Sequence, residues 1–168
     1  MSIIHILVVL IAIFAGLVIC SKDKGTRKHR FWGRVYVLSV VLIIATAFMT
    51  RELQTGIGAY KIFIILSLLF IAAGLYPLFF RKYIKIWVVW HYTFMLYSFL
   101  FLLIAAITHF IDYFRDFLIS LRMIESEANV ASRVLFWFLP FIIGTVWIFS
   151  KKRFYESRFR NFMMRPPK

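Results

Sequence analysis

Four histidines carry most of the chemistry that this sequence offers, because imidazole is a common metal ligand and a proton carrier near neutral pH. His29 stands at the start of one apolar run, and His91 lies about 7 Å inside another at roughly 1.5 Å per helical residue. His5 begins the first apolar run and His109 ends the fourth. If successive runs cross a membrane in opposite directions, His29 and His91 share one side, and His5 and His109 share the other.

A basic segment around His29 adds candidate ligand-binding residues to the His29–His91 pair. Arg30 and Arg34 lie about one helical turn apart, with Gly33 between them. Glycine allows close approach of a ligand or a second helix, and arginine pairs well with a carboxylate, a propionate or a lipid phosphate. We therefore predict an inner site that consists of His29, Arg30, Gly33, Arg34 and His91.

The two histidine pairs raise the question of a bound cofactor. Two neutral imidazoles that face each other across helices can ligate haem iron axially, so His29 and His91 are candidate ligands of a b-type haem, with a quinone as an alternative ligand. A second haem between His5 and His109 would complete a transmembrane electron path. The competing interpretation is that His91 forms a hydrogen bond to a neighbouring helix and that His29 belongs to the basic flank.

The composition indicates that these residues belong to an integral membrane protein. Hydrophobic residues make up 62% of the 168 residues, and the mean hydropathy is +0.84; a soluble domain averages roughly 45–50% apolar residues. The single cysteine, Cys20, excludes an intrachain disulfide and a cysteine-based zinc site. We predict an all-α helical bundle that forms one membrane domain.

Five apolar runs reach or approach the length needed to cross about 30 Å of hydrocarbon. The predicted spans cover residues 3–20, 32–50, 62–80, 86–108 and 134–150. In residues 110–125, apolar and charged side chains alternate at helical spacing, which predicts one amphipathic outer helix. Glu125–Arg133 is predicted as an extramembrane linker, and residues 151–168 form a basic tail.

The net charge of +14 is concentrated in alternate polar segments. Residues 21–34, 81–85 and 151–168 carry +5, +3 and +6, whereas residues 51–61 and 109–133 carry +1 and −1. The positive-inside rule therefore predicts an N-terminus outside and a cytoplasmic C-terminus. The basic flanks are expected to face anionic lipid headgroups, so membrane lipid is a predicted partner and nucleic acid is not.

No signature of a known enzyme class accompanies these features. The motifs HExxH, GxSxG and the P-loop are absent, and no predicted span contains a pair of carboxylates. Proton pumps and ion-coupled transporters normally bury an ionisable residue at mid-membrane depth, which the five runs lack. These absences favour a protein that is not an enzyme.

Two segments follow a recognisable pattern. The first reads K-G-x-x-x-H-R-x-x-G-R-x-Y and consists here of Lys24-Gly25, His29-Arg30, Gly33-Arg34 and Tyr36. The second reads H-x-x-W-M-x-R-S-Y, followed by small residues and a threonine, and matches here at His91, Met95, Ser98, Ala105-Ala106 and Thr108. Three positions of the second pattern differ, with Phe94 for Trp, Tyr97 for Arg and Phe99 for Tyr.

In these segments, the chain resembles an uncharacterised family of bacterial multi-pass predicted membrane proteins. The resemblance covers spans two to four and implies a location in the bacterial cytoplasmic membrane. It also implies that the residues of the inner site act together. It supplies no activity, and the loss of the arginine at Tyr97 removes a charge that the family pattern carries.

Two functional hypotheses follow. In the first, the protein is an accessory or structural subunit that packs against other membrane subunits or lipid. In the second, it is a small b-type haem or quinone-linked redox protein that uses His29 and His91 at the inner site. A transporter or channel protomer ranks third.

Overall fold

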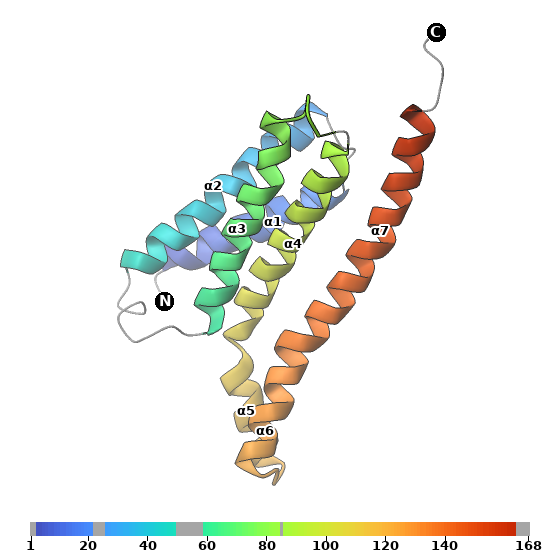
Figure 1. Ribbon diagram of the computed structural model, residues 1–168. Coiled ribbons are helices and arrows are strands. Elements are labelled where there is room, and N and C mark those ends of the chain that lie inside the picture. The colour runs from blue at the N-terminus through green and yellow to red at the C-terminus, as the bar shows by residue number, and fades with distance from the viewer. Residues whose placement is uncertain (1–2, 22–25, 50–58, 85, 164–168) are drawn as a thin grey trace.

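The protein is a bundle of helices with a helical hairpin at one end, as the computed structural model shows (Figure 1). The structure describes residues 3–21, 26–49, 59–84 and 86–163. The helices in these ranges are α1 (Ile3–Ser21), α2 (Arg27–Met49), α3 (Ala59–Phe79), α4 (Trp87–Thr108), α5 (Ile111–Ser120), α6 (Glu125–Arg133), η2 (Val134–Phe138) and α7 (Leu139–Met163). Five helical segments of the described chain are long and apolar enough to cross a membrane. The predicted all-α bundle with five spans is therefore confirmed.

The first four helices pack as two pairs. Helix α1 packs along α2, and α3 packs along α4 over the most extensive contact in the molecule. The two pairs meet through smaller contacts of α2 with α3 and of α1 with α4. Half of the α4 span is buried, more than in any other candidate span. Helix α4 is apolar around its circumference, as expected of a helix that other helices surround.

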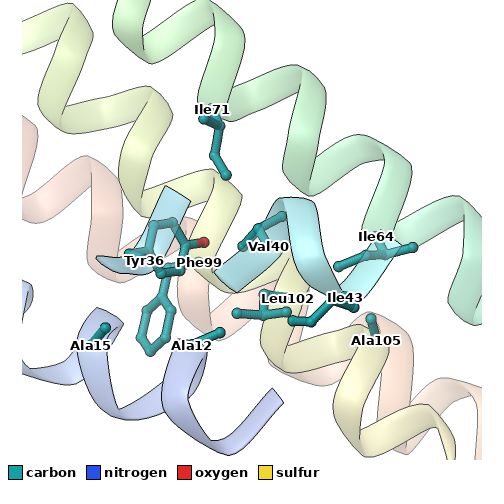
Figure 2. Close-up of a cluster of buried hydrophobic side chains, with 10 residues drawn as sticks. All are labelled: Ala12, Ala15, Tyr36, Val40, Ile43, Ile64, Ile71, Phe99, Leu102 and Ala105. Carbon is teal, nitrogen blue, oxygen red and sulfur yellow. The ribbon is translucent and has the colours of Figure 1, made fainter. Parts of the chain in front are cut away.

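An apolar core joins the two pairs, and Figure 2 shows its buried side chains. They come from all four helices and comprise Ala12, Ala15, Tyr36, Val40, Ile43, Ile64, Ile71, Phe99, Leu102 and Ala105. Gly16 on α1 is essential to this packing, because a Cβ atom at this position would overlap the ring of Phe99 on α4. The absence of a side chain thus lets α1 and α4 approach closely.

Helix α2 begins at Arg27, five residues before the predicted start of the second span. The side-chain oxygen of Thr26 accepts a hydrogen bond from the backbone N–H of His29 at 3.1 Å. A threonine in this position satisfies one of the free N–H groups at a helix start and stabilises the helix. His29 and Arg30 therefore lie on the first turn of α2 and not in a loop.

The segment after α4 forms a helical hairpin instead of one helix and a linker. Helix α5 confirms the predicted amphipathic helix but ends at Ser120. The chain reverses at Arg122, which has a φ of 68°, a left-handed conformation that is common after a helix C-terminus. Helix α6 then packs back against α5, so the predicted linker Glu125–Arg133 is helical. Glu125 and Glu127 in its first turn favour this helix through its dipole.

The last span is longer than predicted because α6 continues through η2 into α7. The π-helical turn η2 precedes Pro140, and the Leu139 N–H bonds to the carbonyl of Val134. The predicted span 134–150 lies inside this helical run. The basic tail is also helical as far as Met163, and residues 164–168 lie outside the described ranges.

Successive spans run in opposite directions, so the charges separate between two ends of the bundle (Figure 1). At the end called here the basic end lie Arg27, Lys28, Arg30, Arg34, Arg81, Lys82, Lys151, Lys152 and Arg153. The α5–α6 hairpin marks the opposite end, called the hairpin end. Which end faces the cytoplasm stays a prediction of the positive-inside rule.

Candidate functional site

The predicted inner residues lie at the basic end, on two helices of different pairs. His29, Arg30, Gly33 and Arg34 occupy the first two turns of α2, and His91 lies in the second turn of α4. Both arginines are exposed, and neither forms an ion pair with a residue of the described ranges. They share one face of α2 because they are four residues apart. This face can bind an anion such as a lipid phosphate or a cofactor carboxylate.

Gly33 does not provide the expected close approach of a second helix. A Cβ atom at Gly33 would meet no atom within 4 Å. Close approaches occur instead at Gly16, at Gly74 and at Gly144. A Cβ at Gly74 would lie 3.1 Å from the sulfur of Met95 on α4, and one at Gly144 would collide with the side chain of Leu100.

His91 forms a hydrogen bond to a neighbouring helix, as one of the two predicted interpretations required. Its Nδ1 lies 2.8 Å from the backbone carbonyl oxygen of Gly74 on α3. A carbonyl only accepts hydrogen bonds, so Nδ1 carries the hydrogen and Nε2 of the neutral ring has the free lone pair. Metal-ligating histidines are oriented in the same way by a bond from the other ring nitrogen. The contact is therefore compatible with both a structural and a ligating histidine.

The two sequence segments that resemble a family pattern meet in the bundle core. Tyr36, the last residue of the first segment, lies with its hydroxyl 2.7 Å from Oγ of Ser98 in the second. Ser67 on α3 contributes a third hydroxyl, 3.2 Å from Ser98. All three side chains are buried, and hydrogen bonds between membrane helices hold the helices in register. Sequence reasoning did not select these residues, although both Tyr36 and Ser98 belong to the recognised patterns.

A second group of polar residues surrounds a cavity at the hairpin end. The cavity has a volume of about 270 Å³ and lies between the α1–α2 pair and the α3–α4 pair. Its polar lining residues are His5, Tyr60, Lys61 and His109. The predicted outer pair of histidines therefore lines one common cavity.

Each polar residue of the cavity has a defined neighbour. Nδ1 of His5 lies 2.9 Å from Oγ1 of Thr46 on α2. The rings of Tyr60 and His109 are 5.1 Å apart between centroids, and Nζ of Lys61 lies 5.7 Å from the Tyr60 ring centroid. Lys61 is only 5% exposed, which is uncommon for a lysine.

The floor of the cavity is the end of the apolar core. Ile43, Ile64, Leu102 and Ala105 line it and are buried, and Figure 2 shows these four side chains together. The walls also contain Ala47 and Ala106. Their small side chains leave the space that larger residues would fill.

Sequence reasoning missed Lys61 and Tyr60, which were assigned to the polar segment between the second and third spans. Helix α3 begins at Ala59, so both residues belong to its first turn. The available signal was an aromatic and a basic residue at the start of a span, at the same predicted depth as His5 and His109.

A metal site with several protein ligands is not found in the described part of the chain, where no three His, Cys, Asp or Glu side chains come together. Axial haem ligation needs only two histidines, so this finding does not decide between the predicted functions.

Comparisons with known proteins place the chain in a family. The family model described as "Predicted membrane protein (DUF2306)" matches residues 2–152, which include all five candidate spans and both sequence segments. No curated protein and no solved structure matches the chain. The predicted relationship to an uncharacterised multi-pass membrane family is confirmed, and the chain belongs to the DUF2306 family of predicted membrane proteins.

Proposed function

We propose that this multi-pass membrane protein is an accessory subunit that binds another membrane protein through α7. The observation that supports this proposal is the difference in burial between the central and the last span. Half of the α4 span is buried, compared with 6% of the span from Glu125 to Arg153. Helix α7 therefore keeps most of its surface available for a partner.

Helix α7 contacts the bundle along one narrow face. Leu100 of α4 packs over Gly144, and Ile148 is buried against Leu96, Leu100 and Ile104. At the hairpin end, the indole N–H of Trp137 donates a hydrogen bond of 3.2 Å to Oγ1 of Thr108. These contacts hold α7 on α4.

The remaining surface of α7 is apolar and exposed over several turns. It includes Ile142, Ile143, Val146, Trp147 and Phe149. Lipid can cover such a surface, but α7 also continues as a helix through the basic segment after Ser150. A partner helix that packs along α7 would thus contact an apolar surface inside the membrane. It would also contact the cationic residues Lys151 and Arg153, which follow this surface on α7.

Site-specific photocrosslinking in cells tests this proposal. Benzoylphenylalanine at Ile142 or Val146 is expected to form a discrete adduct with another membrane protein. The matched control is Leu69, an equally apolar and exposed residue of α3, where no discrete adduct is expected. Equal protein adducts at Leu69 and on α7, no protein adduct on α7, or an adduct that contains only a second copy of this chain would contradict the proposal.

A redox function is the second candidate, and the contact between His91 and Gly74 is compatible with it. Because Nδ1 of His91 is occupied by the carbonyl of Gly74, Nε2 is the nitrogen that can ligate a haem iron. We expect, for this candidate, a Soret band in the purified protein that shifts on reduction with dithionite and is lost in His91→Ala. A flat visible spectrum from the folded, haem-supplemented protein would exclude haem.

A further inference from the structure

We propose that the cavity at the hairpin end holds one acyl chain of a phospholipid from the adjoining leaflet of the membrane. The chain lies along the helices inside the cavity, and the head group of the lipid stays at the membrane surface. This site is independent of the partner surface on α7, so the two proposals can fail separately.

The lining of the cavity selects a ligand without polar groups. Its four polar side chains, which belong to His5, Tyr60, Lys61 and His109, all interact with other residues of the protein. A ligand therefore need not supply partners for them. The other lining residues are apolar and come from α1 to α4, with Phe110 just after α4. Hydrocarbon complements such a surface, because it fills the space without leaving a polar atom of the ligand unpaired.

The cavity is large for an apolar space inside a protein. Its volume is about 270 Å³, whereas an apolar cavity of roughly 150 Å³ already stays dry and can bind benzene. Side chains that line an empty space lose van der Waals contacts on that side. A hydrocarbon chain restores these contacts along the buried floor that Ile43, Ile64 and Leu102 form.

The depth of the cavity matches one leaflet of the membrane. One end of the cavity lies where three spans begin or end, at Ile3 of α1, Ala59 of α3 and Thr108 of α4. On α1 the lining residues run from His5 to Ile13, a rise of roughly 12 Å at about 1.5 Å per residue. One leaflet contributes about 15 Å to a hydrocarbon core of about 30 Å. The cavity therefore fits a chain that belongs to a single leaflet.

The chain can enter the cavity sideways from the bilayer. Ile6 and Leu10 of α1 and Ile65 of α3 line the cavity and are also exposed on the apolar surface of the bundle. Helices α1 and α3 are not among the pairs that pack extensively. A lipid that enters between these two helices keeps its chain in an apolar environment throughout, so the chain never crosses water.

Photolabelling of buried residues tests the proposal. The full-length protein is placed in phosphatidylcholine nanodiscs in which a small fraction of the lipid carries a diazirine in one acyl chain. After irradiation, mass spectrometry identifies the labelled residues. We expect labels on Ile64 of α3 and Leu102 of α4, which are buried and line the cavity. Lipid outside the bundle does not reach these side chains, so a label on them requires a chain in the cavity.

Two further residues of α3 are controls for this experiment. Ile71 lies about two helical turns from Ile64 and is also buried, but it does not line the cavity and is expected to stay unlabelled. Leu69 is exposed and reports labelling by the surrounding lipid. Equal labelling of Ile64 and Ile71, or labels on Leu69 without labels on Ile64 and Leu102, would overturn the proposal.

A cavity-filling variant shows whether the labelling depends on the space. Ala106 lines the cavity, and Ala106→Phe is expected to reduce the labelling of Ile64 about tenfold relative to that of Leu69. Ala72→Phe, at an exposed position of α3 outside the cavity, is the matched control and should leave this ratio unchanged. Equal ratios in the two variants would contradict the proposal.

Folding and the class of chain are checked with the same proteins. Thermal unfolding in detergent verifies that each variant is folded, and Ala47→Phe on α2 is a second cavity-filling variant if Ala106→Phe is not. An isoprenoid quinone that carries a diazirine in its tail is the second probe. If the quinone labels Ile64 and the phospholipid does not, the inferred acyl chain is wrong. Labelling by the phospholipid supports the proposal whether or not the quinone also labels this residue.

Discussion

The two ends of the bundle each hold two histidines, but the structure surrounds them differently. At the basic end, His91 is bonded to the backbone of α3, and Arg30 and Arg34 extend from the surface of α2. At the hairpin end, His5 and His109 line one cavity together with a buried lysine. The comparison shows that two pairs of histidines at matched depths can have different surroundings.

The packing of the helices accounts for the position of the cavity at the hairpin end. Gly16 and Gly74 lie in the half of the bundle nearer the basic end, where they bring α1 and α3 close to side chains of α4. Toward the hairpin end, the two helix pairs are separated by a cavity whose walls include Ala47, Ala105 and Ala106. The close contacts at Gly16 and Gly74 thus lie in one half of the bundle, and the cavity lies in the other half.

The first prediction tests which end faces the cytoplasm, and its result is all or none. Two fusions to the C-terminus are compared. Green fluorescent protein is expected to be fluorescent and alkaline phosphatase is expected to be inactive, because the basic end should be retained in the cytoplasm. The opposite pattern would show that the hairpin end is cytoplasmic and would reverse the assignment of inner and outer histidines.

The second prediction compares two glycines. Gly16→Ala places a methyl group into the ring of Phe99 and is expected to lower the free energy of unfolding by about 1–3 kcal/mol. In Gly33→Ala, the added methyl group enters open space. This variant should raise the free energy of unfolding by up to about 1 kcal/mol, because alanine favours a helix. Unfolding of both variants in detergent measures the difference, and changes of the same sign would contradict the packing described for α1 and α4.

The third prediction concerns the hydroxyl cluster between the two ends. Tyr36→Phe removes the hydrogen bond to Ser98 and is expected to cost about 1 kcal/mol of unfolding free energy. Tyr97→Phe, on the same helix as Ser98, is the control, since the Tyr97 hydroxyl forms no hydrogen bond with a residue that the structure describes. Equal losses in both variants would show that the cluster does not stabilise the bundle specifically.

The smallest effect is expected in the α5–α6 hairpin. The guanidinium of Arg115 bonds to Asp116 at 2.8 Å and to Asp112 at 2.9 Å, and the hydrogen bond to Asp116 raises the pKa of Arg115. Both carboxylates are exposed and Arg115 is partly exposed, and ion pairs at the surface add little to stability. Arg115→Gln should therefore leave the unfolding temperature unchanged, and a clear decrease would show that these ion pairs stabilise the hairpin.

Much of the fold follows from the sequence alone. Long apolar runs determine the spans, because a helix in hydrocarbon must satisfy its backbone internally and needs about 20 apolar residues to cross. The residues at which the helices start and end are less predictable from the sequence. The early start of α2 depends on the cap at Thr26, and α6 depends on the reversal at Arg122, which hydropathy does not detect.

The sequence alone also predicted the charge separation between the ends, the two levels of histidines and the membership of a membrane family. It did not determine which residues face one another, because hydropathy and charge belong to each residue, whereas a cavity depends on how two helices are rotated and how far apart they lie. Lys61 illustrates the difference. It counts as one positive charge in a polar segment of the sequence, and only the packing of four helices makes it a buried lysine that lines the same cavity as His5 and His109.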